Sequence, residues 1–250
     1  MSRNFELLHE AGKVQEMMRQ RVQDFTVPAP GEGFVPGNPA LPIEPGAREE
    51  ITKLVQRLFL SGQRTRQVVF TGTEEGNGCS WICAHAADIL ASQTAGTVCV
   101  VDCDVHYPTL HTEFQVSNHY GLADALVSGE PIRQFAQQLA HPNLWLLSCG
   151  SGNENSQQFL TLERMRKRMF ELRSEFDYVL LDVSPLNAGN HAAVLGGWCD
   201  GIALVLKANS SSRKAARKSL EELQAANVPV LGAVLNQRTY PIPQSIYNRL

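Results

Sequence analysis

Three glycines and a Cys–Ser pair stand between an apolar run and a helical pattern, in the segment TGTEEGNGCS at 71–80. The preceding run at 67–70 is typical of a strand, and the residues from Trp81 onward are typical of a helix, which is the context of a phosphate-binding P-loop. Backbone N–H groups of such a loop surround phosphate oxygens at the positive end of the helix. We therefore expect phosphate contacts from the loop residues Gly76, Asn77, Gly78, Cys79 and Ser80, with the Ser80 hydroxyl also on Mg²⁺.

Cys79 stands where a P-loop carries its lysine. That lysine offsets phosphate charge and stabilises the charge that spreads over the transferred phosphoryl group. A unit-charge interaction at such a distance is worth about 1 to 4 kcal/mol, so its loss should weaken nucleotide binding and slow turnover further. Lys207, Arg213, Lys214 and His106 are the candidates for a substitute cation, but each would have to reach the same oxygens from a different backbone position.

Carboxylates follow two further apolar runs, at 98–101 and 179–181. Asp102 and Asp104 end the first run, and Asp182 ends the second. A single Asp after a strand is commonly a cap or turn residue. Two such strand ends beside a glycine loop instead predict a nucleotide site, in which Mg²⁺ is held directly or through water. The expected catalytic residues are Asp102 and Asp104, and the expected metal ligands are Ser80, Asp102 and Asp182.

Strand and helix patterns alternate along the rest of the chain. Continuous apolar runs such as 178–181 and 202–206 are typical of parallel strands covered on both faces. The predicted fold is α/β, a doubly wound, mostly parallel sheet of the P-loop NTPase type with helices on both faces. Strands are expected at 67–71, 97–102, 143–148, 177–182, 201–207 and 230–235, and helices at 47–60, 79–92, 108–116, 121–127, 131–139, 156–174, 190–197 and 211–226.

The N-terminal part has a different character. Residues 1–26 carry apolar side chains at helical intervals, and residues 27–46 contain six prolines. We expect an amphipathic helix at 1–26, a Pro/Gly-rich linker at 27–46 and a P-loop NTPase-like domain at 47–250. The helix could pack on its own domain or dock on a partner, and we slightly favour docking.

Bulk properties exclude some classes of protein. A net charge of −3 over 250 residues argues against a nucleic-acid binder. The absence of an apolar run of about 18 residues and of a signal-peptide pattern predicts a cytoplasmic protein without a direct membrane span. Six cysteines should be mostly reduced and buried. A metal or redox site at Cys79, Cys83 and Cys103 has no CxxC or Cys/His spacing to support it.

These motifs together resemble the cytoplasmic ATPase module of bacterial tyrosine kinases, within the deviant P-loop ATPases that position division sites and partition plasmids. The residues VVDCDVH at 100–106 match an apolar run followed by Asp-x-Asp-x-Arg, except that His106 replaces the arginine. The Walker B pattern Asp-x-x-Pro of these proteins matches at 182–185. The residues GLADAL at 121–126 resemble the Gly-Leu-Ser-Asp-x-Leu turn of the same family. Asp200-Gly201 and the GAVLN segment at 232–236 also fall in register, so the resemblance covers about 44–250.

The resemblance implies ATP or ADP and Mg²⁺ as cofactors, with Asn236 at the purine base. It also implies a homo-oligomer at the inner membrane face, held by a membrane-embedded polysaccharide co-polymerase or export protein. Relatives carry a Glu/Arg oligomerisation motif, to which Arg48, Glu49, Glu50 and Arg57 correspond loosely; a solvated charged face is the default interpretation. Relatives also end in a tyrosine-rich cluster, whereas this chain has two tyrosines near its end, Tyr240 and Tyr247.

Three functions remain open on this sequence. The first is a degenerate tyrosine-kinase-like protein that acts as a regulatory or scaffolding subunit in exopolysaccharide synthesis or export, with or without bound nucleotide. The second is an active Mg-ATP-dependent tyrosine autokinase or ATPase that uses a substitute cation. The third is a nucleotide-independent interaction module that docks through residues 4–25. We favour the first, because the loop keeps its shape and its neighbouring carboxylates but lacks the lysine.

Overall fold

The computed structural model describes residues 41–62, 65–150 and 162–238. The predicted N-terminal helix, most of the predicted linker, and Tyr240 and Tyr247 lie outside these residues, so the three-part division of the chain stays a prediction. None of the helices in the described ranges combines the length and the apolar character needed to cross a membrane.

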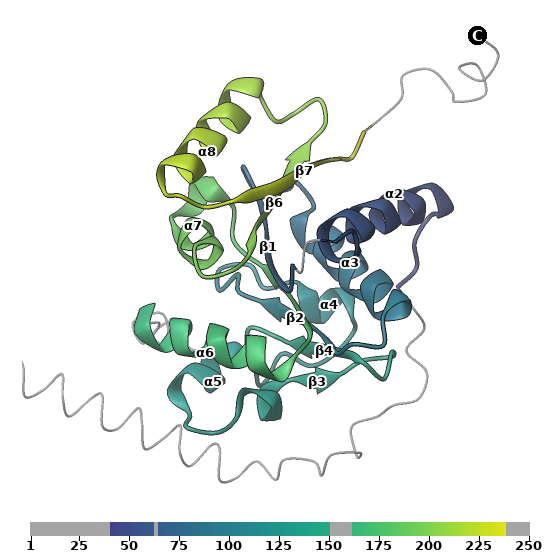
Figure 1. Ribbon diagram of the computed structural model, residues 1–250, viewed down its shortest axis with the longest axis vertical. Coiled ribbons are helices and arrows are strands. Elements are labelled where there is room, and N and C mark those ends of the chain that lie inside the picture. Colours follow the sequence, from purple (N-terminus) through teal and green to yellow (C-terminus); the bar gives the residue numbers. More distant parts are fainter. Residues whose placement is uncertain (1–40, 63–64, 151–161, 239–250) are drawn as a thin grey trace, which may run out of the picture.

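A seven-stranded sheet forms the centre of the described structure, with the order β3-β4-β2-β5-β1-β6-β7 (Figure 1). Every neighbouring pair is parallel except β3 and β4, which are antiparallel. The predicted mostly parallel, doubly wound sheet is therefore confirmed. The strands are β1 (Gln67–Gly72), β2 (Val98–Asp102), β3 (Gln137–Gln138), β4 (Leu144–Leu147), β5 (Tyr178–Asp182), β6 (Gly201–Lys207) and β7 (Val230–Asn236).

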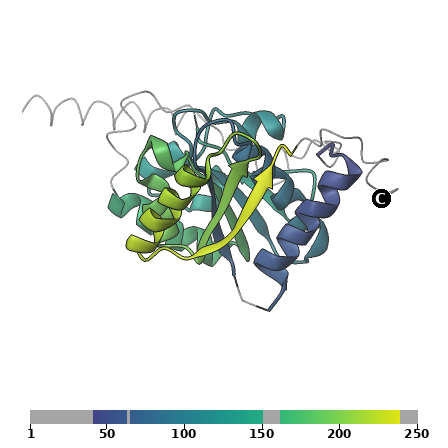
Figure 2. The ribbon, with the colours of Figure 1, turned by 90° about the horizontal axis from the view of Figure 1, so that it is seen from above.

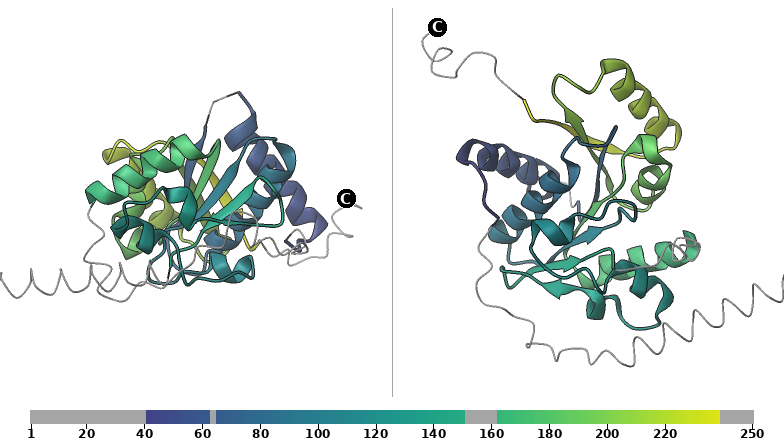
Figure 3. Two further views of the ribbon diagram at one scale, coloured as in Figure 1. Left: turned by 90° about the horizontal axis from the view of Figure 1, so that it is seen from below. Right: turned by 180° about the vertical axis from the view of Figure 1, so that it is seen from behind.

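Helices cover both faces of this sheet, as Figure 2 shows from above and Figure 3 from two further sides. Helices α2 and α3 lie on one face, and α5, α6, α7 and α8 lie on the other. The helical elements are α2 (Pro45–Val55), the π-helical turn η1 (Gln56–Leu60), α3 (Cys79–Gln93), α4 (Leu110–Glu113), α5 (Leu122–Val127), the 3₁₀ turns η2 (Ile132–Phe135) and η4 (Leu186–Ala188), α6 (Leu162–Glu175), α7 (His191–Gly196) and α8 (Arg213–Ala225).

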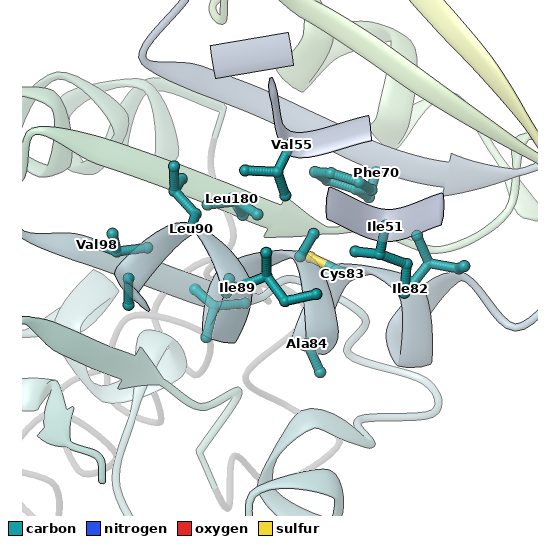
Figure 4. Close-up of a cluster of buried hydrophobic side chains, with 14 of the residues drawn as sticks. Ile51, Val55, Phe70, Ile82, Cys83, Ala84, Ile89, Leu90, Val98 and Leu180 are labelled. Atoms are coloured by element: carbon teal, nitrogen blue, oxygen red, sulfur yellow. The ribbon is translucent and has the colours of Figure 1, made fainter. Parts of the chain in front are cut away.

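Alternate strand residues divide between two buried clusters, one on each face. In β1, Val68 and Phe70 point into the cluster under α2 and α3, whereas Val69 points into the cluster on the other face. Figure 4 shows the first cluster, where Ile51 and Val55 of α2 meet Phe70. Side chains alternate between the two faces of a strand, so a strand buried on both sides is apolar at every position. This explains the continuous apolar runs in the sequence.

Two expected helices are shorter in the structure than the pattern predicted. The expectation of a helix at 131–139 was wrong, because only η2 forms there and Gln137 then pairs with Leu146 in an antiparallel bridge. The helix expected at 108–116 is reduced to α4. It cannot continue past Gln115, whose φ of 54° is left-handed.

Candidate functional site

The glycine loop joins the end of β1 to the start of α3 at the carboxyl edge of the sheet. Gly76 and Gly78 have φ values of 76° and 75°, a left-handed conformation that glycine adopts without steric cost. Helix α3 runs for 15 residues from Cys79 and has no side-chain cap at its first residue. The N–H groups of its first turn therefore lack intrahelical acceptors and form the positive end of the helix dipole.

Two asparagine side chains hold this loop in shape. The Asn77 amide nitrogen donates to the carbonyl of Val205, at 3.0 Å, and to Thr73 Oγ1, at 3.2 Å. Asn236 Nδ2 donates to the backbone carbonyl of Asn77, at 2.9 Å, while its Oδ1 accepts the N–H of Gln237. Both polar groups of Asn236 are thus used within the protein, and its contact with a purine base stays a prediction.

Asp102 is fully buried at the end of β2 and is surrounded by backbone donors. Its Oδ2 accepts the N–H groups of Thr109, at 3.0 Å, and Leu110, at 3.1 Å, and its Oδ1 accepts the N–H of Asp104, at 3.2 Å. Burial raises the pKa of Asp102 to about 7, against the opposing effect of these hydrogen bonds. The carboxyl group holds the following loop in place and does not line the cavity described below.

Asp182 lies beside Asp102 in the sheet, at the end of β5. The Ser80 hydroxyl and the Cys79 thiol both interact with its carboxyl group, but Oδ2 is buried without a hydrogen-bond partner. Burial, together with the neighbouring Asp102 and Asp104, raises the pKa of Asp182 to about 8, and the Ser80 and Cys79 contacts oppose this rise. An unpartnered buried carboxylate oxygen is a ready acceptor for a donor or a cation.

Asp104 connects the two strand ends. Its Oδ1 accepts the Ser184 hydroxyl at 2.8 Å, and it also accepts the backbone N–H groups of His106 and Tyr107, both at 3.1 Å. Ser184 follows β5, so this contact ties the loop after β2 to the loop after β5. No local sequence pattern predicts this role for Ser184, because Asp104 and Ser184 lie 80 positions apart.

A cavity of about 360 Å³ opens beside the loop and is lined by its residues, including Gly76, Asn77, Gly78, Cys79 and Ser80. Its lining contains five acidic side chains, and within the described ranges it contains no lysine or arginine. The acidic residues are Glu74, Glu75, Asp104, Glu113 and Asp182. Glu74 and Glu75 could have been found in the loop sequence, but Glu113 comes from α4 and only the fold brings it here.

None of the four candidate substitute cations lines this cavity. His106, Lys207, Arg213 and Lys214 are absent from its lining. Cys79 itself is neutral in this environment, because burial and the nearby Asp182 raise the pKa of its thiol well above the usual value. The described structure therefore provides no positive side chain at the position of the missing lysine.

The site fits the two expected cofactors unequally. The Ser80 hydroxyl and the unpartnered Asp182 oxygen are the hard oxygen donors that Mg²⁺ prefers. Across the part of the chain that the structure describes, no three His, Cys, Asp or Glu side chains form a complete metal cluster, so further ligands would have to come from water or phosphate. The loop N–H groups fit a phosphate, but the described residues that line the cavity include no lysine beside them.

The charged residues of the loosely matched oligomerisation motif are exposed, three on α2 and Arg57 on η1. Lys53 forms ion pairs with Glu49 and Glu50, each at 2.9 Å. Such solvent-exposed pairs contribute little to stability. A subunit contact through Arg48, Glu49, Glu50 and Arg57 stays a prediction.

Known proteins resemble this chain in sequence and in fold. Residues 65–226 match the family model for cellulose biosynthesis protein BcsQ. The chain is 29% identical over 174 residues to tyrosine-protein kinase YwqD of Bacillus subtilis, covering 70% of this chain and 73% of that protein. It is 26% identical over 169 residues to tyrosine-protein kinase etk of Escherichia coli, covering 68% of this chain and 23% of that protein. The chain thus spans about a quarter of the length of etk.

A solved structure shows the same fold. The kinase domain of Escherichia coli tyrosine kinase ETK superimposes with a TM-score of 0.69 and 23% identity, over 78% of this chain and 79% of that one. The chain therefore belongs to the BcsQ family of cellulose biosynthesis proteins, within the larger group of P-loop ATPases that includes the bacterial tyrosine kinases.

Proposed function

We propose that this protein is a regulatory or scaffolding subunit of an exopolysaccharide synthesis or export system, with a P-loop site that holds nucleotide but does not turn it over. The observation that carries this proposal is the cavity beside the loop, where Cys79 replaces the lysine and five carboxylates are present without a lysine or arginine among the described residues.

Phosphoryl transfer needs positive charge where negative charge develops. Known P-loop enzymes supply it with the loop lysine, Mg²⁺ and in many cases an arginine. Here the neutral Cys79 thiol takes the place of the lysine, and Glu74, Glu75, Asp104 and Glu113 add negative charge around the same space. These acidic residues destabilise the negative charge that develops during phosphoryl transfer. The site is therefore suited to binding a nucleotide but not to transferring its phosphate.

The chain's own residues still offer a place for nucleotide. Backbone N–H groups from Gly76 to Ser80 would hold phosphate oxygens, and the Ser80 hydroxyl with the Asp182 carboxyl would hold Mg²⁺. Bound Mg-ATP would supply a transferable phosphoryl group, but none of the described residues that line the cavity is a lysine or arginine that could promote its transfer. A partner would then recognise the nucleotide-occupied state of this site.

The relatives suggest where such a subunit works. The family model is one of cellulose biosynthesis, and the relatives at 29% and 26% identity are named tyrosine-protein kinases. We place the protein at the cytoplasmic face of the inner membrane, held there by a membrane-embedded co-polymerase or export protein and assembled as a homo-oligomer. The segment at 4–25 is the proposed docking element.

The test is a direct measurement of turnover. Purified protein is incubated with Mg-ATP, and released phosphate and phosphotyrosine are measured beside the Asp182→Asn variant. We expect wild type and variant to give the same background signal. Turnover by wild type that disappears in Asp182→Asn would overturn the proposal, because it would show that the site catalyses without its lysine.

A further inference from the structure

We infer that the cavity beside the glycine loop selects a nucleoside diphosphate over a nucleoside triphosphate. This inference rests on the proposed nucleotide site and adds its specificity. It follows from the distribution of charge around the loop, because one end of the cavity presents N–H donors and every charged side chain among the described lining residues is acidic.

The donor end of the cavity suits one phosphate group. The loop from Gly76 to Gly78 is held in its left-handed turns by the Asn77 and Asn236 side chains, so its shape exists before any ligand binds. Helix α3 begins directly after it, at Cys79, and extends for 15 residues. Preformed N–H donors at a helix N-terminus bind a phosphate without help from a lysine, although less tightly.

Asp182 provides an independent sign that a ligand belongs here. The residue is 2% exposed and lines the cavity, yet its Oδ2 has no hydrogen-bond partner. A buried carboxylate oxygen left without a partner is costly in a folded protein. A hydrated Mg²⁺ on the phosphates of a bound nucleotide would satisfy this oxygen, with the Ser80 hydroxyl beside it.

The same lining disfavours a third phosphate. A triphosphate carries more negative charge than a diphosphate, and it would enter a cavity with Glu74, Glu75, Asp104 and Glu113 in its lining. In an ordinary P-loop the lysine reaches the β- and γ-phosphates and offsets that additional charge. Cys79 offers no such compensation, and none of the described lining residues is a lysine or arginine that could replace it. The electrostatic repulsion from the acidic lining is therefore larger for the triphosphate than for the diphosphate.

The experiment is calorimetric titration of the full chain with ADP and with ATP, each with and without Mg²⁺. We expect ADP with Mg²⁺ to bind at least tenfold more tightly than ATP with Mg²⁺, which corresponds to about 1.4 kcal/mol. The Cys79→Lys variant should improve ATP binding more than ADP binding and so reduce the ratio. Gln93→Lys adds the same charge at the exposed far end of α3 and should leave the ratio unchanged.

A second variant covers the case in which Cys79→Lys does not fold. Glu75→Gln removes one acidic group at an exposed loop position and should also reduce the preference for ADP. Equal or tighter binding of ATP by wild type would overturn the inference and leave the proposed scaffolding role standing. Absence of ADP binding at millimolar concentration would overturn it as well. Detectable ATP turnover would instead overturn the proposed function. The ratio of ADP to ATP affinity would still test the inferred selectivity for a diphosphate.

Discussion

The ends of β2 and β5 carry the same residue in the same position but surround it differently. Asp102 and Asp182 are direct neighbours in the parallel register, and both are buried. Asp102 accepts three backbone N–H groups, whereas Asp182 Oδ2 accepts none. The difference separates a carboxylate that holds the protein together from one that remains available to a ligand.

The cause lies in the chain that follows each strand. After β2 the loop turns back, so that the N–H groups of Thr109 and Leu110 point at Asp102. After β5 the N–H of Val183 is already bonded to the carbonyl of Phe70, and Pro185 has no N–H to offer. Burial alone therefore does not show what an acidic residue at a strand end does. The number of backbone N–H groups that the following loop brings to its carboxyl group separates the two cases.

The largest expected effect is the loss of the Asp102 carboxyl group. Asp102→Ala would leave three N–H donors without their acceptor in a buried place. We expect the free energy of unfolding to fall by about 3 kcal/mol or more, measured by urea denaturation. Asp177→Ala is the matched control, since this exposed residue also accepts bonds at a strand but is screened by solvent. Equal losses in the two variants would show that the buried hydrogen bonds of Asp102 contribute no more than those of an exposed carboxylate.

The second effect concerns pH and Asp182. The pKa of Asp182 is raised to about 8, so the folded state binds its proton more tightly than the unfolded state, where the usual value is 3.8. The resulting stabilisation is complete below the unfolded pKa and is lost as pH rises through about 8, at up to about 1.4 kcal/mol per pH unit. Asp102, with a pKa raised to about 7, acts in the same direction.

Asp182→Asn cannot titrate, so its unfolding free energy should fall less steeply between about pH 5 and about pH 8 than that of wild type. At the upper end we expect the variant to be more stable by about 2 kcal/mol. Denaturant unfolding across this range, without Mg²⁺, makes the measurement. Asp177→Asn should keep the wild-type slope, because the pKa of Asp177 is lowered and its titration ends below this range. A wild-type slope in Asp182→Asn would contradict the assignment.

The smallest effect tests the link between the two strand ends. Ser184→Ala removes the hydroxyl that donates to Asp104 Oδ1, and we expect a loss of about 1 kcal/mol in unfolding free energy. The loss should be absent when the same substitution is made in an Asp104→Ala background, which a double-mutant cycle measures. Additive losses would show that the contact does not couple the two loops.

Local patterns were sufficient for much of the fold and part of the site. Continuous apolar runs predicted the parallel strands, and the glycine loop between a strand and a helix pattern predicted the joint at β1 and α3. The strand β3 was missed because two residues leave no alternation to detect, and its pairing partner Leu146 lies in β4. The helix expected at 131–139 does not form in full, because the pairing of Gln137 with Leu146 of β4 outweighs the local preference of this segment for a helix.

What the sequence by itself determined is the type of fold, the position of the loop and the replacement of lysine by Cys79, because each depends on residues that are neighbours along the chain. The tertiary structure alone decided which carboxylate is available. Asp102 and Asp182 follow similar apolar runs, and the backbone donors that the fold brings to Asp102, above all Thr109 and Leu110, distinguish them. The approach of Glu113 to the loop likewise depends on the placement of α4. The charge of a cavity is the sum over residues that the fold brings together, so it cannot be obtained from any one segment.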